Sequence, residues 1–317
     1  MTATDWRERI ITVFGGGGFI GRYVCEALFK TGVRVRVAQR DPRGAFFLQP
    51  LAAVGQLDLV RADFTRPQSL EAAVEGTWGV INLVGAFSGK LDAVHGNAPA
   101  RIAELAAKGG AASFTHVSAI GVSEDSASFY ARTKAAGENK VRAAFPGATI
   151  IRPSVVFGPE DQFTNRFAGM SSLPIMPVLG GKTRFQPIFV RDLGSAIAKA
   201  AQQPERFAAQ TFELGGPDVM TMHELNRAIA EAAGRKPEIV DLPDVVGSAM
   251  SRLGFLPGAP ITRDQWIMLQ KDNVASGPGL EAFGIQPTPL AAVAPEWLGR
   301  FHEGGRFASR RSQSSVG

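Results

Sequence analysis

Tyr130 and Lys134 are the residues of this sequence whose types and spacing best suit proton transfer. On a helix, their spacing of four positions puts both side chains on one face. A nearby ammonium favours the phenolate form, so we expect Lys134 to lower the pKa of Tyr130 toward a range useful for acid–base chemistry. Because the chain contains only 2 tyrosines, a chance pair at this spacing is infrequent. The alternative interpretation is an amphipathic helix that carries the pair by accident.

A glycine-rich segment near the N-terminus joins an apolar, β-branched stretch to a helical one. Gly15 permits a tight turn, Gly18 lets the backbone approach a pyrophosphate, and Gly21 lets the helix pack closely on the strand. The N-terminus of that helix then offers unpaired N–H groups and a positive dipole end to phosphate. In this context the glycines predict a dinucleotide-binding loop, and a ligand-free turn is the alternative.

The end of the second predicted strand indicates which dinucleotide is bound. Sites that prefer NAD carry Asp or Glu about 20 residues beyond the glycine loop, where it binds the ribose 2′-hydroxyl. Here Gln39 and Arg40 occupy that region, and no carboxylate stands at the strand end. The Arg40 guanidinium can fork onto a 2′-phosphate, so we expect NADP(H) to be preferred over NAD(H). A solvated basic edge is the alternative.

Strand and helix signals alternate through the first half of the chain. Strands are expected over residues 9–14, 33–38, 57–62, 79–84, 113–118 and 148–151, and helices over residues 19–30, 69–75, 98–108 and 130–144. Near-continuous apolar strands that alternate with helices predict an α/β fold, a Rossmann doubly wound parallel sheet.

The second half is less regular. We expect helices over residues 190–203 and 221–233, the latter opened by a capping box of Thr221 and Glu224, and a strand over 212–214. The expected organisation is an NADP-binding Rossmann domain over residues 1–152, then a mixed region over 153–303. That region contributes late sheet strands and a smaller C-terminal α/β lobe of the substrate-binding type. Residues 304–317 are expected to form a disordered tail.

Composition and charge exclude several classes of protein. The 317 residues are 45 % hydrophobic and 20 % charged, which is ordinary for a globular protein. A single cysteine, Cys25, excludes an intramolecular disulfide and a multi-cysteine zinc site, and the four isolated histidines predict no metal site. A net charge of +5 argues against a nucleic-acid partner. No apolar run approaches the roughly 20 residues that span a bilayer, so a cytoplasmic location is expected.

Taken together, these motifs resemble a known superfamily. The glycine loop, Asp63, the segment Asn82–Gly85 and the Tyr130–Lys134 pair resemble the extended and atypical short-chain dehydrogenases/reductases, which include the NAD-dependent epimerases and dehydratases. More narrowly, the sequence resembles the NDUFA9 family, relatives of an accessory subunit of respiratory complex I (NADH:ubiquinone oxidoreductase). The segments that carry this narrower resemblance are Phe114–Ser118, Tyr130–Glu138, Ile151–Asn165, Pro260–Gln265 and Lys271–Val274.

The resemblance implies a role for each matching residue. Gly15, Gly18, Phe19, Ile20 and Gly21 would hold the pyrophosphate, Arg40 the 2′-phosphate, Asp63 and Phe64 the adenine, Leu83, Val84 and Gly85 the adenine ribose, and Tyr130, Lys134 and Pro153 the nicotinamide. Tyr130, Lys134 and Ser118 would be the catalytic residues. Active members carry Ser or Thr at the position of Ala119, however, and Ser118 stands one residue early, where a strand side chain points the opposite way.

The resemblance therefore implies an NADP(H)-binding accessory subunit or assembly factor of complex I, with weak or no turnover. The alternative is a free-standing NADPH-dependent oxidoreductase or epimerase that acts on a small carbonyl or hydroxyl substrate through Tyr130 and Lys134. The first interpretation implies complex I subunits as partners and a peripheral position on the inner face of the respiratory membrane. Two segments offer contact surfaces for it, the apolar stretch Val245–Leu256 and the tail with Arg306, Arg310 and Arg311.

Overall fold

The computed structural model describes residues 6–86, 89–254 and 261–303, which form two compact units. The described part of the first unit comprises residues 6–153, 190–214 and 276–286, without 87–88. The described part of the second unit comprises residues 154–189, 215–254, 261–275 and 287–303. Pro260, Leu256, the expected tail over 304–317 and its three arginines lie outside the described residues.

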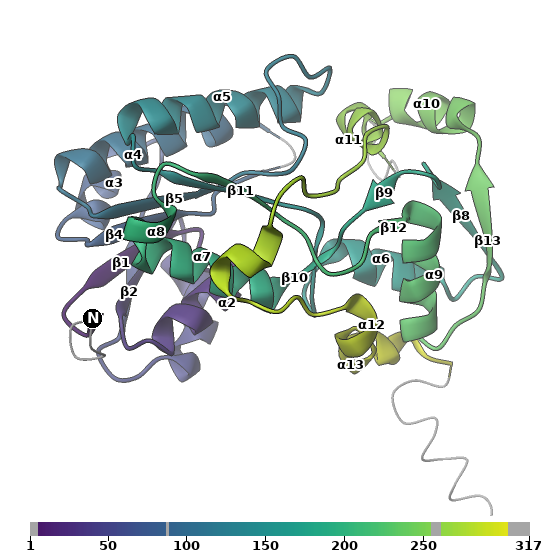
Figure 1. Ribbon diagram of the computed structural model, residues 1–317, viewed down its shortest axis with the longest axis horizontal. Coiled ribbons are helices and arrows are strands. Elements are labelled where there is room, and N and C mark those ends of the chain that lie inside the picture. Colours follow the sequence, from purple (N-terminus) through teal and green to yellow (C-terminus); the bar gives the residue numbers. More distant parts are fainter. Residues whose placement is uncertain (1–5, 87–88, 255–260, 304–317) are drawn as a thin grey trace, which may run out of the picture. The chain divides into compact units, whose positions relative to one another are not determined.

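The first unit is built on a seven-stranded sheet with the order β11-β6-β5-β4-β1-β2-β3, and every pairing is parallel (Figure 1). The strands are β1 (Ile10–Phe14), β2 (Arg34–Gln39), β3 (Leu57–Arg61), β4 (Gly79–Asn82), β5 (Ser113–Val117), β6 (Thr149–Pro153) and β11 (Thr211–Leu214). The strand order reverses between β1 and β4, and in open α/β sheets the crevice at such a switch point is where ligands bind. The predicted Rossmann fold is confirmed.

Helices cover both faces of this sheet. One face carries α3 (Pro67–Val74), α4 (Ala98–Lys108) and α5 (Phe129–Ala144), and the other carries α2 (Phe19–Phe29) and α7 (Val190–Gln202), with α8 (Pro204–Phe207) after it (Figure 1). Buried apolar residues of β1, β4, β5 and β6, among them Phe14, Val80, Phe114 and Ile150, pack under the first face. A side chain at Gly194 would overlap the backbone of Tyr23, so glycine is what lets α7 approach α2.

Three expected strands end earlier than the sequence suggests, and the first of them, β3, stops at Arg61, one residue short. β4 stops at Asn82 because the Asn82 side-chain oxygen accepts a hydrogen bond from the N–H of Val84 and turns the chain. β5 stops at Val117, which leaves Ser118 beyond the strand. The 3₁₀ segment η1 (Pro42–Leu51) and the π-helical turn η2 (Asp92–Asn97) have no counterpart among the expected elements. The 3₁₀ segment η3 (Gly279–Phe283) is the last element of this unit along the chain.

The second unit combines short strand pairs with helices. The strands are β7 (Val156–Phe157), β8 (Ile175–Leu179), β9 (Arg184–Phe185), β10 (Ile188–Phe189), β12 (Met220–Thr221) and β13 (Glu238–Leu242), paired as β7 with β10, β8 with β13 and β9 with β12. The helices are α6 (Gln162–Met170), α9 (Met222–Ala232), α10 (Asp244–Arg252), α11 (Arg263–Leu269), α12 (Leu290–Val293), α13 (Pro295–Leu298) and η4 (Gly299–Phe301). The capping box predicted for α9 is present.

Candidate functional site

The glycine loop between β1 and α2, called the glycine cradle below, has a backbone that requires glycine at Gly15 and Gly21. Gly15 adopts a φ of +82°, and the N–H of Gly18 donates to the Gly15 carbonyl at 3.0 Å. A Cβ at Gly21 would overlap the Gly15 carbonyl oxygen, and one at Gly18 would approach it at 3.2 Å. No side chain caps α2, so the N–H groups of its first turn, at Phe19 and Ile20, face the loop without a side-chain acceptor. This arrangement fits a pyrophosphate.

The end of β2 reaches this loop. Gln39 accepts a hydrogen bond from the N–H of Gly17 at 3.0 Å through Oε1 and donates one from Nε2 to the Asp41 carbonyl at 2.7 Å. Asp41 also caps η1 and pairs with Arg43 at 3.2 Å. Arg40 is exposed, and within the described ranges no carboxylate pairs with it. Arg40 directly follows Gln39, the residue that contacts the loop, so its guanidinium is available to solvent or to a ligand.

The residues expected at the adenosine end follow β3 and β4. Asp63 is held in a turn, since its Oδ1 accepts from the N–H of Thr65 at 2.9 Å and from the Thr65 hydroxyl at 2.7 Å, and these hydrogen bonds lower the pKa of Asp63. Phe64 packs on the core. The N–H of Leu83 donates to the Phe14 carbonyl at 3.0 Å, which carries the loop Leu83–Gly85 past the glycine cradle. Contact of these residues with adenine or ribose stays a prediction.

Tyr130 and Lys134 lie in the first two turns of α5, and both are buried. Burial lowers the pKa of Lys134 to about 8, although the carboxylate of Glu138 acts in the opposite direction. Burial also raises the pKa of Tyr130 to about 12, so the expectation that Lys134 lowers it is wrong in this state of the chain. The physical reason is that the Lys134 ammonium donates to the Val117 carbonyl at 2.9 Å and leaves the desolvation of the phenolate uncompensated.

The structure brings the candidate catalytic and nicotinamide-site residues to one edge of the sheet. The N–H of Ser118 donates to the Ile151 carbonyl at 2.7 Å, and that of Ile120 donates to the Pro153 carbonyl at 3.1 Å, so Ser118 and Pro153 share the carboxyl ends of β5 and β6. The Ser118 hydroxyl is buried and has no hydrogen-bond partner among the described residues. A Cβ at Gly85 would lie 3.7 Å from Lys134 Nζ, which places the β4 loop at the same edge.

Two buried histidines belong to this region, although the sequence analysis assigned no histidine to the site. His116 accepts a hydrogen bond at Nδ1 from the Asn82 side chain at 2.9 Å, across the neighbouring strands β5 and β4. His95 contacts Ala86 and Thr133 through its two ring nitrogens. Burial lowers the pKa of both rings. The strand register would have been needed to find the first pair, and no spacing motif marks the second. Cys25 is buried in α2.

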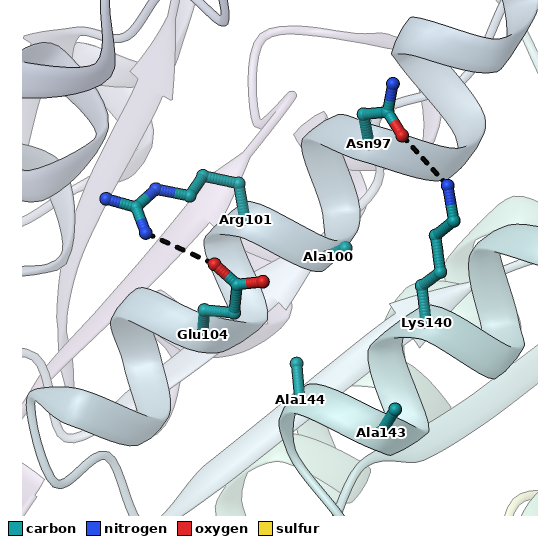
Figure 2. Close-up of a pocket in the computed structure, with 7 residues that line it drawn as sticks. All are labelled: Asn97, Ala100, Arg101, Glu104, Lys140, Ala143 and Ala144. Atoms are coloured by element: carbon teal, nitrogen blue, oxygen red, sulfur yellow. Dashed lines mark hydrogen bonds and ion pairs between the residues drawn. The ribbon is translucent and has the colours of Figure 1, made fainter.

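A groove of about 510 Å³ between α4 and α5 lies apart from these residues (Figure 2). Alanines form its floor, and its charged side chains are engaged: Arg101 pairs with Glu104 at 3.2 Å, and Lys140 donates to Asn97 at 2.9 Å. None of the candidate cofactor or catalytic residues lines it. Within the described residues, no cluster of His, Cys, Asp and Glu suits a metal ion, and no helix is long and apolar enough to cross a membrane.

Comparison with known proteins agrees with this geometry. Residues 11–215 match the model of the NAD dependent epimerase/dehydratase family. The chain belongs to this family. It shares 36 % identity over 302 residues with the rat protein named NADH dehydrogenase [ubiquinone] 1 alpha subcomplex subunit 9, mitochondrial, covering 92 % of this chain and 80 % of that protein. It also shares 32 % identity over 248 residues with the ceramide reductase of Caulobacter vibrioides, covering 76 % of each.

Among solved structures of the same fold is the Citrobacter triphenylmethane reductase complexed with NADP(H). It superposes with a TM-score of 0.73 at 18 % identity, over 90 % of this chain and 99 % of that one. The resemblance to the epimerase/dehydratase superfamily and, within it, to complex I subunits is thus confirmed, and the fold is an NAD(P)-binding one.

Proposed function

We propose that this chain binds NADP(H) and acts as an accessory subunit or assembly factor of respiratory complex I, with weak or no turnover. The similarity to the complex I subunit of rat extends over 92 % of the chain and so includes both units. A relationship of this extent supports a shared role better than a match confined to the dinucleotide-binding unit would.

The single observation that carries the proposal is a contrast. The glycine loop is shaped to hold a cofactor, whereas Tyr130 and Lys134 are not arranged for proton transfer. The glycines, the uncapped start of α2 and the exposed Arg40 are arranged to hold a dinucleotide. The Lys134 ammonium is bonded to a backbone carbonyl, and burial raises the pKa of Tyr130 to about 12. Position 119, where a hydroxyl would assist a substrate oxygen, is alanine.

The preference for NADP(H) over NAD(H) rests on the end of β2. Gln39 offers an amide where a carboxylate would bind the ribose 2′-hydroxyl, and Arg40 offers a guanidinium to a 2′-phosphate. Phe19 and Ile20 would bind the pyrophosphate through their N–H groups, and Lys134 would bind the nicotinamide ribose. The bound cofactor would supply hydride chemistry at its nicotinamide ring. Tyr130 would pack beside that ring and hold its proton.

Association with complex I implies a cytoplasmic protein, peripheral on the inner face of the respiratory membrane. The second unit offers an apolar surface for such contact on α10 and the residues next to it. Val245 is 80 % exposed, Val246 37 % and Leu253 56 %. Isolated apolar side chains are normal on a protein surface, but two exposed valines on one short helix, with an exposed leucine directly after it, suit a partner.

Fractionation of cells at low and high ionic strength tests this assignment. The proposal predicts that the chain sediments with membranes and complex I at low salt and is released by salt without detergent. A chain found entirely in the soluble fraction at low salt, and absent from purified complex I, contradicts it.

A free-standing NADPH-dependent reductase is the second candidate. The observation that favours it is the retention of Tyr130 and Lys134 on one face of α5, together with the similarity to a ceramide reductase. In that case Tyr130 would donate a proton to a substrate oxygen, and Ser118 would bind that oxygen. Oxidation of NADPH by the purified chain on addition of ketones, including keto forms of ceramide, or of quinones would favour this candidate. Retention of NADPH without turnover would favour the first.

A further inference from the structure

His95 lies between the loop that follows β4 and helix α5, which carries Tyr130 and Lys134. It lies in the π-helical turn η2, directly before α4, and it is fully buried. Its ring meets the ring of Tyr130 edge to face, with 5.1 Å between centroids. A Cβ at Gly137 would overlap the His95 carbonyl oxygen, so a glycine on α5 is what allows this close approach.

The hydrogen bonds of His95 define its tautomer. The N–H of Ala86 donates to Nε2 at 3.1 Å, so Nε2 carries no proton and Nδ1 does. The proton on Nδ1 is donated to the Thr133 hydroxyl at 3.0 Å, and that hydroxyl donates to the Tyr130 carbonyl at 2.9 Å. His116 takes the opposite tautomer, because its Nδ1 accepts from Asn82. A continuous series of donors thus runs from Ala86 to the backbone of Tyr130.

We propose that His95 is a positioning residue of the cofactor site, which in its neutral Nδ1–H form ties the loop after β4 to the start of α5. Ala86 directly follows Gly85, whose Cβ position lies 3.7 Å from Lys134 Nζ. Thr133 directly precedes Lys134. The tie therefore sets the separation between the loop after β4, which is expected at the adenine ribose, and the start of α5, which would hold the nicotinamide. This inference rests on the proposed binding of NADP(H).

The electrostatic surroundings keep the imidazole neutral. Burial and the charge of Lys134 lower the pKa of His95 to about 4, so the ring holds a single proton at neutral pH. A neutral ring can accept from Ala86 and donate to Thr133 at once, whereas an imidazolium would lose the acceptor that Ala86 needs.

The proposal is tested by substitutions that remove the hydrogen bonds of His95 to Ala86 and Thr133 but keep the packing of the side chains. His95→Phe keeps a ring against Tyr130 but removes both hydrogen bonds, and Thr133→Val removes the hydroxyl while keeping its shape. His95→Gln retains an oxygen for the N–H of Ala86. The matched control is Thr149→Val, which removes an equally buried hydroxyl bonded at 3.0 Å to the Phe207 carbonyl, at the amino end of β6.

The readout is the dissociation constant of NADPH, measured by fluorescence. Because His95→Phe removes both hydrogen bonds of the tie, we expect roughly tenfold weaker binding, which corresponds to about 1.4 kcal/mol. We expect a smaller loss for Thr133→Val, recovery for His95→Gln, and no change for Thr149→Val. If His95→Phe binds NADPH as the wild type does, or if Thr149→Val weakens binding equally, a positioning role is overturned.

A second measurement does not depend on cofactor. The chain has 4 histidines, so ¹⁵N-histidine labelling gives a simple spectrum in which His95 should show the Nδ1–H tautomer. An Nε2–H ring at His95 overturns the proposal. If the wild-type chain binds no NADPH, the proposed function is contradicted. Hydrogen exchange then tests whether His95 ties the loop after β4 to α5. Faster exchange at residues 84–86 in His95→Phe, but not in Thr149→Val, supports the tie, and unchanged exchange overturns it.

Discussion

The Lys134 ammonium donates a hydrogen bond to the Val117 carbonyl at 2.9 Å and so anchors α5 to the carboxyl end of β5. The anchor is almost fully buried, and the burial lowers the pKa of Lys134 to about 8 from an ordinary 10.5. The protonation state of Lys134 therefore affects both the stability of the fold and the charge in the candidate site.

Stability should depend on pH through this lysine. Between pH 8 and 10.5 the unfolded chain binds a proton at Lys134 that the folded chain does not, so the free energy of unfolding rises with pH across this window. This lowering of the Lys134 pKa corresponds in full to roughly 3 kcal/mol. We expect Lys134→Met to be more stable than the cofactor-free wild type at pH 7, and to lack this rise. Denaturant unfolding at pH 7, 9 and 10.5 measures both, and a wild-type stability that is flat over this window contradicts the account.

Cofactor preference should depend on Arg40. A charge-assisted bond to a phosphate is worth roughly 1.5–3 kcal/mol, so Arg40→Ala should weaken NADPH binding about tenfold or more and leave NADH binding unchanged. Arg43→Ala is the matched control, because Arg43 lies in the same exposed segment but pairs with Asp41. Calorimetric titration of the wild type and both variants with each cofactor gives the six affinities. Equal affinity of the wild type for NADH and NADPH would refute the assignment of Arg40.

Substitutions at Lys134 and at Tyr130 should have different effects on the affinity for NADPH. Lys134→Ala should weaken NADPH binding, since the ammonium would bond to the nicotinamide ribose, whereas Tyr130→Phe should leave the affinity close to that of the wild type. If the wild type shows a reductase activity that Tyr130→Phe abolishes, the second candidate function gains and the accessory role loses support.

The glycine cradle should tolerate no side chain at its tightest point. Gly21→Ala would force a Cβ against the Gly15 carbonyl and the backbone of Gly16. Overpacking of this kind costs about 1–3 kcal/mol, and it should also displace the N–H groups that would bind phosphate. Gly277→Ala, at a position with no atom within 4 Å, should change neither stability nor NADPH affinity. A Gly21→Ala chain with wild-type affinity would show that the loop does not hold the cofactor.

Acid should destabilise the chain through its buried histidines. The pKa of His95 falls from 6.5 to about 4 on folding, so the unfolded chain binds the extra proton between these values and stability falls as the pH is lowered through them. His116 adds a loss of the same sign. Lys134 is the charged neighbour that lowers the pKa of His95, Lys134 and His95 both lower that of His116, and all three residues lie within the same unit. His95→Gln should show a shallower loss between pH 6.5 and 4 in urea unfolding, and an unchanged slope would contradict this.

Much of the first unit follows from local patterns. Continuous apolar strands, glycines at fixed spacing and the helix bearing Tyr130 were sufficient to predict the parallel sheet and the glycine-rich turn between β1 and α2. These signals are local because each depends on residues within one or two elements. Helix boundaries agreed closely, as for α4 at Ala98–Lys108.

Contacts between distant segments could not be predicted in the same way. The pKa of Tyr130 depends on burial and on where the Lys134 ammonium points, and neither is encoded in their spacing. His95 reaches Thr133 across 38 positions, through a π-helical turn that no propensity marks. Asn82 and His116 become partners only once β4 and β5 are in register. Polar networks of this kind are properties of the packed fold.

The most direct test of the central claim is to isolate complex I under mild conditions from cells that express either the wild-type chain or Arg40→Ala, and to quantify both the chain and its bound nucleotide. The account predicts that the wild-type chain copurifies with the complex and carries NADP(H), and that Arg40→Ala reduces the nucleotide. A complex that lacks the chain, with NADPH-dependent reductase activity recovered in the soluble fraction, would contradict it.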